Sequence, residues 1–356
     1  MAVKQGRIDV HHHVIPPAFV ETMQAKGIEK VAGAPLPKWV PENSIAVMDA
    51  NGIQTAITSL SAPGVHFGDG VAQAVELARR CNEFSAGMME QYPGRFGFFA
   101  VLPMPFTEKA CAEAIYALDH LNADGVVLLG STDGHFLGDP RFDELMSELD
   151  RRRAVVFVHP NLHATSVNIG LNIPGFLIEF LCDTTRAAIN LILSGTQEKY
   201  PNTRWILAHA GGFLPFVARR LATVKLPDVE KNAPKGVQHY IERFYFDTAL
   251  SPSKYSMVAL KELVDPSHIL FGSDFPFAPA PASALQCRTL DESDLFSEQI
   301  KYGITRGHAL ELFPRYRLSD EVVAAQPIFE SESVSGRLRR AMTGPMSSLV
   351  ESMRNR

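Results

Sequence analysis

The stretch RIDVHHH (residues 7–13) runs from a strand-like segment directly into three histidines. An open doubly wound sheet that binds a dinucleotide would carry a GxGxxG turn after its first strand, and no such turn follows residue 10. Alternate side chains of an extended strand share a face, so we expect His11 and His13 to point together and His12 to point away. This pattern predicts a pair of metal ligands; a histidine-rich surface loop or the remnant of a tag is the alternative interpretation.

Strand-like runs alternate with helix-like segments along most of the chain, which predicts an α/β fold. The expected strands are 7–10, 55–60, 96–102, 125–129, 155–158, 205–208, 244–247 and 269–271. The expected helices include 70–92 and 176–200, each ending just before a proline. Eight strands joined by helices favour a TIM-type (β/α)8 barrel, with the open doubly wound sheet as the alternative.

The barrel is expected to occupy residues 1–318, because the composition changes after that point. Residues 319–356 are rich in Ser, Glu, Arg and Met and poor in large apolar side chains, which predicts a C-terminal extension. Within it, residues 334–353 would form an amphipathic helix that docks on a neighbour, or would be mobile.

Composition excludes several classes of function. The 356 residues are 46% hydrophobic with a net charge of −5, and no basic block could follow a phosphate backbone. No apolar run approaches the roughly 20 residues of a membrane helix, and no secretory h-region follows Met1, so we expect a cytoplasmic protein. The four cysteines are far apart without a CxxC pair, so a metal would be held by histidine and carboxylate.

Polar side chains close three further predicted strands. His159 ends one apolar run, His209 ends the next, and Asp274 follows the last. A barrel gathers its active site at the carboxyl ends of its strands, and imidazoles with one carboxylate are the usual ligands of a catalytic zinc. A single histidine at such a place is more often a buried, hydrogen-bonded side chain, but four agreeing strand ends favour a metal site.

The motifs together identify a family resemblance over residues 7–313. These are DVHHH (9–13), SLSAPGVHF (59–67), RFGFFAVLPM (95–104), VFVHP (156–160), DTTRAAINLILSGTQEKYP (183–201), WILAHAGGFLPFVARR (205–220), RFYFDTA (243–249) and ILFGSDFPF (269–277). The chain resembles the amidohydrolase superfamily, in the branch of aminocarboxymuconate-semialdehyde decarboxylase and the aromatic-acid decarboxylases such as 6-methylsalicylate decarboxylase.

The resemblance implies a set of site residues. The ligands of one divalent metal ion would be His11, His13, His159 and Asp274, and His209 would be the catalytic histidine. Zn2+ is the first choice for the ion, and Mn2+ is possible in the aromatic branch. Two-metal members carry a bridging lysine or acid at the end of the fourth strand, whereas residues 124–131 read DGVVLLGS, so we expect a single metal.

Substrate contacts are expected from three further residues. Arg220 lies where similar family members offer an arginine to a substrate carboxylate, sometimes across a dimer interface; a surface ion pair is the alternative, and Arg219 is expected to be solvated. His163 would contact a phenol or lie idle on its loop. Phe277, together with Phe213 and Phe275, would sandwich an aromatic ring or belong to the core.

The departures from the muconate-type pattern favour a monocarboxylate. That enzyme has a second substrate-binding arginine before its second strand, and residues 41–44 of this chain, PENS, have none. One arginine suits an aromatic acid such as 6-methylsalicylate better than a dicarboxylic acid.

The leading hypothesis is therefore a metal-dependent decarboxylase of a hydroxylated aromatic or similar unsaturated carboxylic acid, with Asp274 or His209 delivering the proton. Hydrolysis of an amide, an ester or lactone, or a C–C bond at the same metal is the alternative, because it uses the same ligands. A non-catalytic barrel that serves as an assembly or binding module is a third hypothesis. A homodimer or a dimer of dimers is expected.

Overall fold

The computed structural model describes residues 6–169, 172–223 and 225–318. Eight parallel strands form one sheet in the order β1-β4-β5-β6-β9-β10-β11-β12. Their bounds are β1 Arg7–His13, β4 Ile53–Ser59, β5 Phe96–Val101, β6 Gly125–Leu129, β9 Val155–His159, β10 Arg204–Leu207, β11 Tyr245–Asp247 and β12 Ile269–Leu270. All eight expected strands are present, and β1 continues three residues beyond its expected end.

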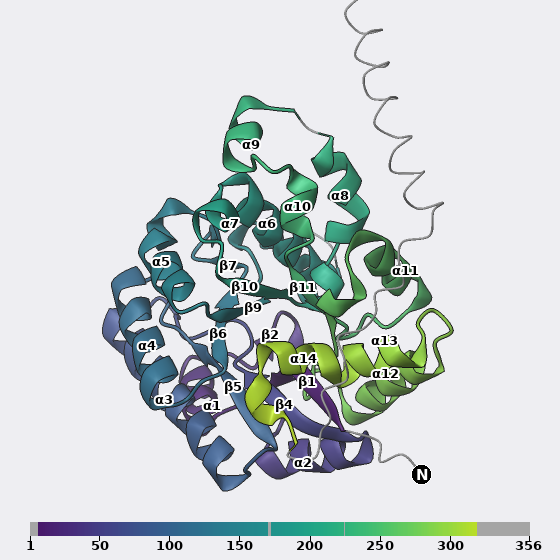
Figure 1. The fold of residues 1–356 in the computed structure, drawn as a ribbon. Helices are drawn as coiled ribbons and strands as arrows, with labels where there is room; N and C mark the ends of the chain where they lie inside the picture. Colours follow the sequence, from purple (N-terminus) through teal and green to yellow (C-terminus); the bar gives the residue numbers. More distant parts are fainter. Residues whose placement is uncertain (1–5, 170–171, 224, 319–356) are drawn as a thin grey trace, which may run out of the picture. The chain divides into compact units, whose positions relative to one another are not determined.

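Hydrogen bonds between the first strand and the end of the last close the sheet. The Val10 N–H donates to the Phe271 carbonyl at 2.9 Å, and the Asp274 N–H donates to the His11 carbonyl at 2.7 Å. Figure 1 shows β1 beside β4 in the lower part of the ribbon, with the helices outside the strands. The expected barrel is confirmed, and the open doubly wound sheet is wrong, because β1 and β12 are not free edges.

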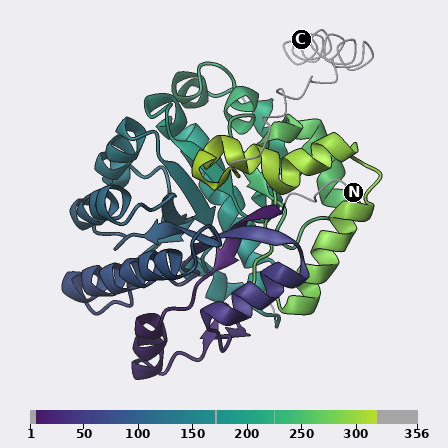
Figure 2. The ribbon, with the colours of Figure 1, turned by 60° about the horizontal axis from the view of Figure 1, so that its bottom comes forward.

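Helices surround the strands, as Figure 2 shows from a second direction. Their bounds are α1 Pro17–Ala25, α2 Pro41–Ala50, α3 Val71–Gln91, α4 Thr107–His120, α5 Asp143–Arg151, α6 Glu179–Leu193, α7 Thr196–Lys199, α8 Leu214–Ala222, α9 Pro227–Asn232, α10 Val237–Ile241, α11 Lys254–Leu263, α12 Ala280–Glu292, α13 Glu298–Tyr302 and α14 His308–Leu312. Two short hairpins, β2 Lys30–Val31 with β3 Ala34–Pro35 and β7 Ser131–Thr132 with β8 His135–Phe136, lie in the loops. None of these helices combines the length and the apolar character that crossing a bilayer requires.

The helix expected over 70–92 is confirmed as α3, whereas the helix expected over 176–200 is wrong in its extent. Residues Gly175–Leu177 form a short 3-10 turn, α6 ends at Leu193, and α7 begins at Thr196. Gly195 lies between the two helices with φ 82°, a left-handed conformation that glycine adopts without steric strain. The expected helix is therefore interrupted at Gly195, before it reaches Pro201. The extension expected over 319–356 lies outside the described residues.

The amino end of the barrel is held by a buried carboxylate. Asp124 precedes β6 and accepts hydrogen bonds from the Tyr316 hydroxyl at 2.7 Å and from the Phe98 N–H at 3.0 Å. Arg315 contributes an ion pair to the same carboxylate at 2.6 Å. Gly97 on β5 leaves the space that this cluster fills, because a Cβ there would overlap both Tyr316 and Asp124.

We therefore expect Gly97→Ala to lower the free energy of unfolding by about 2 kcal/mol, the usual cost of forcing a methyl group into a filled site. Urea denaturation would measure the change. Gly87→Ala is the matched control, because Gly87 lies on α3 with open space around it, and alanine there should raise stability by up to about 1 kcal/mol. Equal effects of the two substitutions would contradict this account of Gly97.

Candidate metal centre

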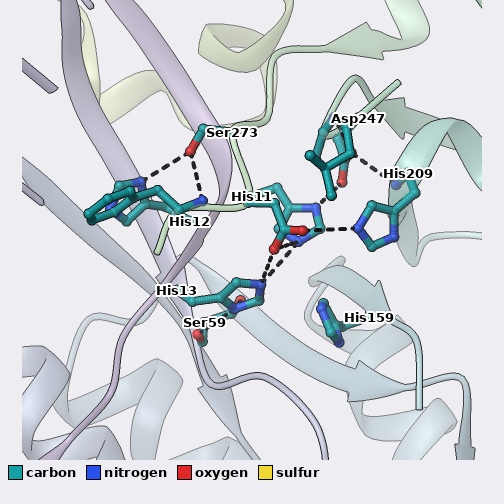
Figure 3. Close-up of polar contacts among 12 residues, drawn as sticks. His11, His12, His13, Ser59, His159, His209, Asp247 and Ser273 are labelled. Atoms are coloured by element: carbon teal, nitrogen blue, oxygen red, sulfur yellow. Dashed lines mark hydrogen bonds and ion pairs between the residues drawn. The ribbon is translucent and has the colours of Figure 1, made fainter. Parts of the chain in front are cut away.

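Four side chains from three strand ends meet inside the carboxyl end of the barrel. His11 and His13 come from β1, His159 closes β9, and Asp274 follows β12. One ligand atom from each lies within 4.8 Å of the others, and all four residues are buried. Figure 3 shows the rings of His11, His13 and His159 directed towards one region. The four predicted metal ligands are thus together, and within the described residues they are the one such group.

The alternation expected along β1 is confirmed. His11 Nε2 and His13 Nε2 are 3.1 Å apart, whereas His12 lies on the other side of the strand (Figure 3). His12 Nδ1 is 3.0 Å from Asp9, and its Nε2 is 2.8 Å from the Ser44 hydroxyl. His12 therefore belongs to the packing between β1 and α2 and has no place in the cluster.

Each ring of the three histidines is oriented by an acceptor at its Nδ1. His11 Nδ1 lies 2.8 Å from Asp247, His13 Nδ1 3.1 Å from the Ser59 carbonyl, and His159 Nδ1 2.8 Å from the Pro160 carbonyl. A carbonyl oxygen can only accept, so Nδ1 of His13 and of His159 carries the proton, and the carboxylate favours the same tautomer for His11. The three Nε2 lone pairs then converge beside one carboxylate.

The charges of the cluster favour a positive charge beside its carboxylates. Burial lowers the pKa of His11, but Asp247 and Asp274 together outweigh burial and raise this pKa to about 10. Burial lowers the pKa of His13 and holds that of His159 well below its usual range, with neighbouring histidines adding to the effect. A divalent ion would supply the positive charge that the carboxylates favour while leaving all three imidazoles neutral. The donor set therefore fits a single divalent metal, because three imidazoles and one carboxylate are a common ligand set for such an ion.

Asp274 presents its two oxygens to different partners. Oδ1 lies 3.0 Å from His13 Nε2 and 3.4 Å from His11 Nε2, whereas Oδ2 lies 3.4 Å from His209 Nε2. Burial acts to raise the pKa of Asp274, but the facing histidines hold it well below its usual range. One oxygen can therefore serve the metal while the other faces His209.

His209 is held close to the cluster by a tight turn. Its φ is 54°, that of Ala210 is 55°, and its N–H donates to Asp247 Oδ1 at 3.0 Å. Left-handed non-glycine residues are uncommon and are concentrated at functional sites. Gly212 completes the turn, since a Cβ there would overlap the Leu181 carbonyl. The Nδ1 of His209 is buried and has no hydrogen-bond partner among the described residues, which leaves this ring available to a ligand.

Asp247 is a functional residue that the sequence analysis missed. It closes β11, is fully buried, and joins two site residues, because one oxygen faces His11 Nδ1 and the other accepts from the His209 N–H. The signal was available, since the motif RFYFDTA places an aspartate at the end of a predicted strand. That aspartate had no predicted role because its partners lie on other strands.

A second network of buried polar groups holds the backbone on which the ligands stand. Asp9 Oδ1 accepts the N–H groups of His11 at 3.1 Å and of Ser273 at 3.0 Å. Asp9 Oδ2 accepts the Ser273 hydroxyl at 2.5 Å. One carboxylate thereby ties a metal ligand on the first strand to the residue before Asp274.

A similar set of hydrogen bonds joins the segments that follow β6 and β9. Asp183 on α6 accepts the Ser131 hydroxyl at 2.5 Å and the Asn161 N–H at 2.9 Å. Burial raises the pKa of Asp183 to about 6, although both hydrogen bonds oppose the shift. This carboxyl group therefore links α6 to Ser131, after β6, and to Asn161, two residues after His159.

The predicted substrate contacts lie at different distances from the cluster. The ring of Phe277 meets that of His13 edge-on at 5.2 Å, whereas Phe275 packs against His12. His163 stacks on Phe136, with Nδ1 2.8 Å from the Thr165 hydroxyl and Nε2 3.3 Å from the Gly134 carbonyl. One nitrogen of His163 is thus engaged by Thr165 in its own loop, and the other by Gly134 in the hairpin of β7 and β8.

Arg220 lies on α8 with an exposed side chain, as does Arg219. Among the described residues its guanidinium has no ion pair or hydrogen bond, and the Arg220 carbonyl accepts from the Thr223 hydroxyl. Phe213, which precedes α8, is 38% exposed.

The end of the fourth barrel strand offers no second metal site. Asp124 lies at the opposite end of β6, where Tyr316 binds it. The side chain of Leu128 is buried, and that of Leu129 is partly exposed at the carboxyl end. The described part of the chain therefore supports one metal ion.

Known proteins resemble the chain over nearly the whole barrel. A family model described as amidohydrolase matches residues 8–315. The chain is 38% identical over 329 residues to the decarboxylase yanB of Aspergillus niger, with 88% of each chain covered. It is 37% identical over 318 residues to the 6-methylsalicylic acid decarboxylase of Penicillium expansum, covering 88% of this chain and 97% of the relative.

Solved structures share the fold. A crystal structure of an amidohydrolase II has a TM-score of 0.82 and 33% identity, covering 87% of this chain and all of its own. A dihydroxybenzoic acid decarboxylase of Polaromonas, solved with manganese and the inhibitor 2-nitroresorcinol, has a TM-score of 0.74 and 24% identity, covering 88% and 98% of the two chains.

The assignment of four residues, but not His209, to the metal can be tested by measuring metal content. We expect one divalent ion per chain in the wild type and in His209→Ala, but none in His159→Ala, because only His159 belongs to the donor set. Elemental analysis of dialysed protein would measure this. Two tightly bound ions per chain, or an empty site in His209→Ala, would contradict the assignment.

Asp247 should raise the affinity of the site for its metal, because it orients the ring of His11. Asp247→Asn should weaken metal affinity on the order of 10- to 100-fold, the usual effect of losing the carboxylate that orients a ligand histidine. Competition with a chromophoric chelator would give the dissociation constant. Asp228→Asn, at an exposed position on α9, is the control and should bind metal as the wild type does.

Proposed function

The chain belongs to the amidohydrolase family, and from this we propose that it is a metal-dependent carboxy-lyase that decarboxylates a hydroxylated aromatic acid. One observation carries the proposal: Asp274 faces the histidine donors with one oxygen and His209 with the other. A cation site thus lies directly beside a pair of groups that can exchange a proton. Relatives that are 37–38% identical over 88% of this chain are decarboxylases.

Decarboxylation is difficult because the electron pair of the broken C–C bond remains on a ring carbon. Protonation of that carbon before the bond breaks removes the difficulty, since the electron pair then returns to the ring and restores its aromaticity as carbon dioxide leaves. The metal, when bound, would hold the carboxylate and an adjacent oxygen and offset their negative charge. The protein must therefore supply one proton at a defined position.

His209 and Asp274 Oδ2 form the proposed proton source. They lie 3.4 Å apart, close enough to share a proton once a substrate tightens the site. Asp247 accepts the backbone N–H of His209 and so fixes the turn of the backbone from which its ring projects. In this proposal, the pair delivers its proton to the ring carbon that bears the carboxylate and regains one from solvent after the product leaves.

We propose 6-methylsalicylate, or a similar monocarboxylic phenol, as the substrate. Phe277, with its ring against His13, provides an aromatic wall for such a ring, and Phe180 lies 5.8 Å from His159 on another side. For the metal we propose Zn2+ or Mn2+, since the nitrogen-rich donor set suits zinc while the similar decarboxylase of Polaromonas was solved with manganese.

A homodimer belongs to the proposal because α8 and α11 expose large aromatic side chains. Phe216 is 90% exposed, and Tyr255 is 92% exposed. Phe216 and Arg220 are four residues apart and share one face of α8, so a partner that covers the phenylalanine also meets the arginine. We propose that Arg220 reaches the carboxylate of the substrate in the partner's site. A cytoplasmic location is consistent with four free cysteines.

Carbon dioxide release from a panel of hydroxybenzoates, by protein loaded with Zn2+ or Mn2+, tests the activity. His209→Asn should lower kcat by at least about a hundredfold with its metal retained, because a general acid is lost. His120→Asn, at an exposed position on α4, should leave kcat unchanged. Hydrolysis of an ester or amide without any carbon dioxide release from these acids would instead support the hydrolase alternative.

Arg220→Ala should raise KM by about 10- to 100-fold, since a lost charged hydrogen bond costs on the order of 1.5–3 kcal/mol. Arg219→Ala is the matched control and should leave KM unchanged. Mixed dimers of Arg220→Ala and His209→Ala chains should regain the wild-type KM in one of their two sites if Arg220 acts across the interface. A mixed dimer that keeps the raised KM would place the arginine in its own chain's site or outside both sites.

A further inference from the structure

We propose that a small cavity beside the metal cluster binds a methyl-sized apolar substituent of the substrate ring, and that His66 binds a substrate oxygen at its edge. The cavity lies at the carboxyl ends of β4, β5 and β6. Its wall includes Leu60, Val65, His66, Leu102, Met104 and Leu129. This inference rests on the proposed function and adds a determinant of substrate choice to it.

Strand register places the cavity next to the metal ligands. Leu129 pairs with His159, and Val127, which also lines the cavity, pairs with Phe157. Directly paired residues of adjacent strands direct their side chains to the same face, so both lining residues face the barrel interior with their partners. The ring of Phe157 lies 4.9 Å from that of His11.

The opposite wall includes a residue next to one that orients a ligand. Leu60 directly follows Ser59, whose carbonyl orients His13. The cavity is thus bounded on one side by Leu129, which pairs with His159, and on the other by Leu60, which follows Ser59. A substituent next to the carboxylate of a metal-bound substrate would lie within reach of this cavity.

The size of the cavity selects its occupant. Its volume is about 20 Å³. A cavity of roughly 10–15 Å³ on this measure holds one water molecule, so this one has room for about one small group, such as a methyl. The wall is formed mainly by apolar side chains, and apolar cavities bind apolar groups in preference to water. A methyl group is therefore the fitting occupant.

His66, which lines the cavity, carries a polar atom that is unpaired within the described part of the chain. Its Nδ1 is buried and lacks a hydrogen-bond partner among the described residues, although nearly all buried polar atoms in proteins have one. Phe106 packs edge-on against the ring at 5.0 Å and limits its movement. A carboxylate or hydroxyl oxygen of the substrate would complete this nitrogen's hydrogen bonding.

The test compares salicylate, 6-methylsalicylate and 6-ethylsalicylate with the metal-loaded protein, by calorimetric binding and by carbon dioxide release. The wild type should prefer the methyl compound to salicylate by about tenfold or more in kcat/KM and in Kd, the usual effect of one buried methyl group. Leu129→Phe should remove this preference by filling the cavity. Leu129→Val should improve the ethyl compound relative to the methyl compound.

Leu128→Val is the matched control, because Leu128 neighbours Leu129 on β6 but directs its side chain to the opposite face. It should leave the order of preference unchanged. His66→Ala should weaken binding of all three acids about tenfold, and His66→Asn should restore part of the loss because its amide can occupy the place of Nδ1.

The outcomes separate this inference from the proposed function. Carbon dioxide release with equal kcat/KM for salicylate and 6-methylsalicylate, unaltered by Leu129→Phe, would overturn the subsite and leave the decarboxylase standing. Preferential binding of the methyl compound without carbon dioxide release would uphold the subsite and contradict the decarboxylase. Absence of both binding and release would overturn both.

Discussion

The buried carboxylate of Asp9 joins the first strand of the barrel to the segment after the last strand, and the metal site depends on that junction. Its oxygens accept two backbone N–H groups and one hydroxyl, from His11 on the first strand and Ser273 after the last. Hydrogen bonds to a charged, buried acceptor are among the stronger ones in proteins. They keep His11 in register with Asp274, 263 positions away in the sequence, so that donors from both ends of the barrel meet.

Orientation of the donors comes from acceptors outside the cluster. Two carbonyl oxygens and one carboxylate bind the Nδ1 atoms and so direct the three Nε2 lone pairs towards one region. Asp247 has a further role, because it binds His209 as well as His11. A single buried side chain thus couples the position of the proposed proton donor to that of a metal ligand. A substitution at such a position would disturb metal affinity and proton transfer together.

The same framework explains how one side of the site can recognise the substrate ring. Parallel strands bring the side chains of β6 and β9 to the barrel interior in matched pairs, so an apolar residue on β6 lies beside a ligand on β9. Chemistry therefore resides on β1, β9 and the segments after β10 and β12, whereas the shape of the pocket resides on β4 to β6 and their loops. Such a division lets the reacting groups stay constant while the loops determine which acid binds.

The sequence by itself determined the eight strands, the barrel and the polar residues at the strand ends, because each depends on local patterns: apolar runs, alternation along an extended strand, and the residue that closes a strand. It also separated His12 from its neighbours on that basis. The division of these polar residues into four donors and His209 came from the family resemblance. Only the tertiary structure decided the roles of Asp247 and Asp9 and the cavity beside Leu129, because each depends on partners from strands or loops far apart in the chain. The break at Gly195 was missed for a related reason: a glycine inside a helical pattern ends the helix only where the surrounding packing takes up its left-handed conformation.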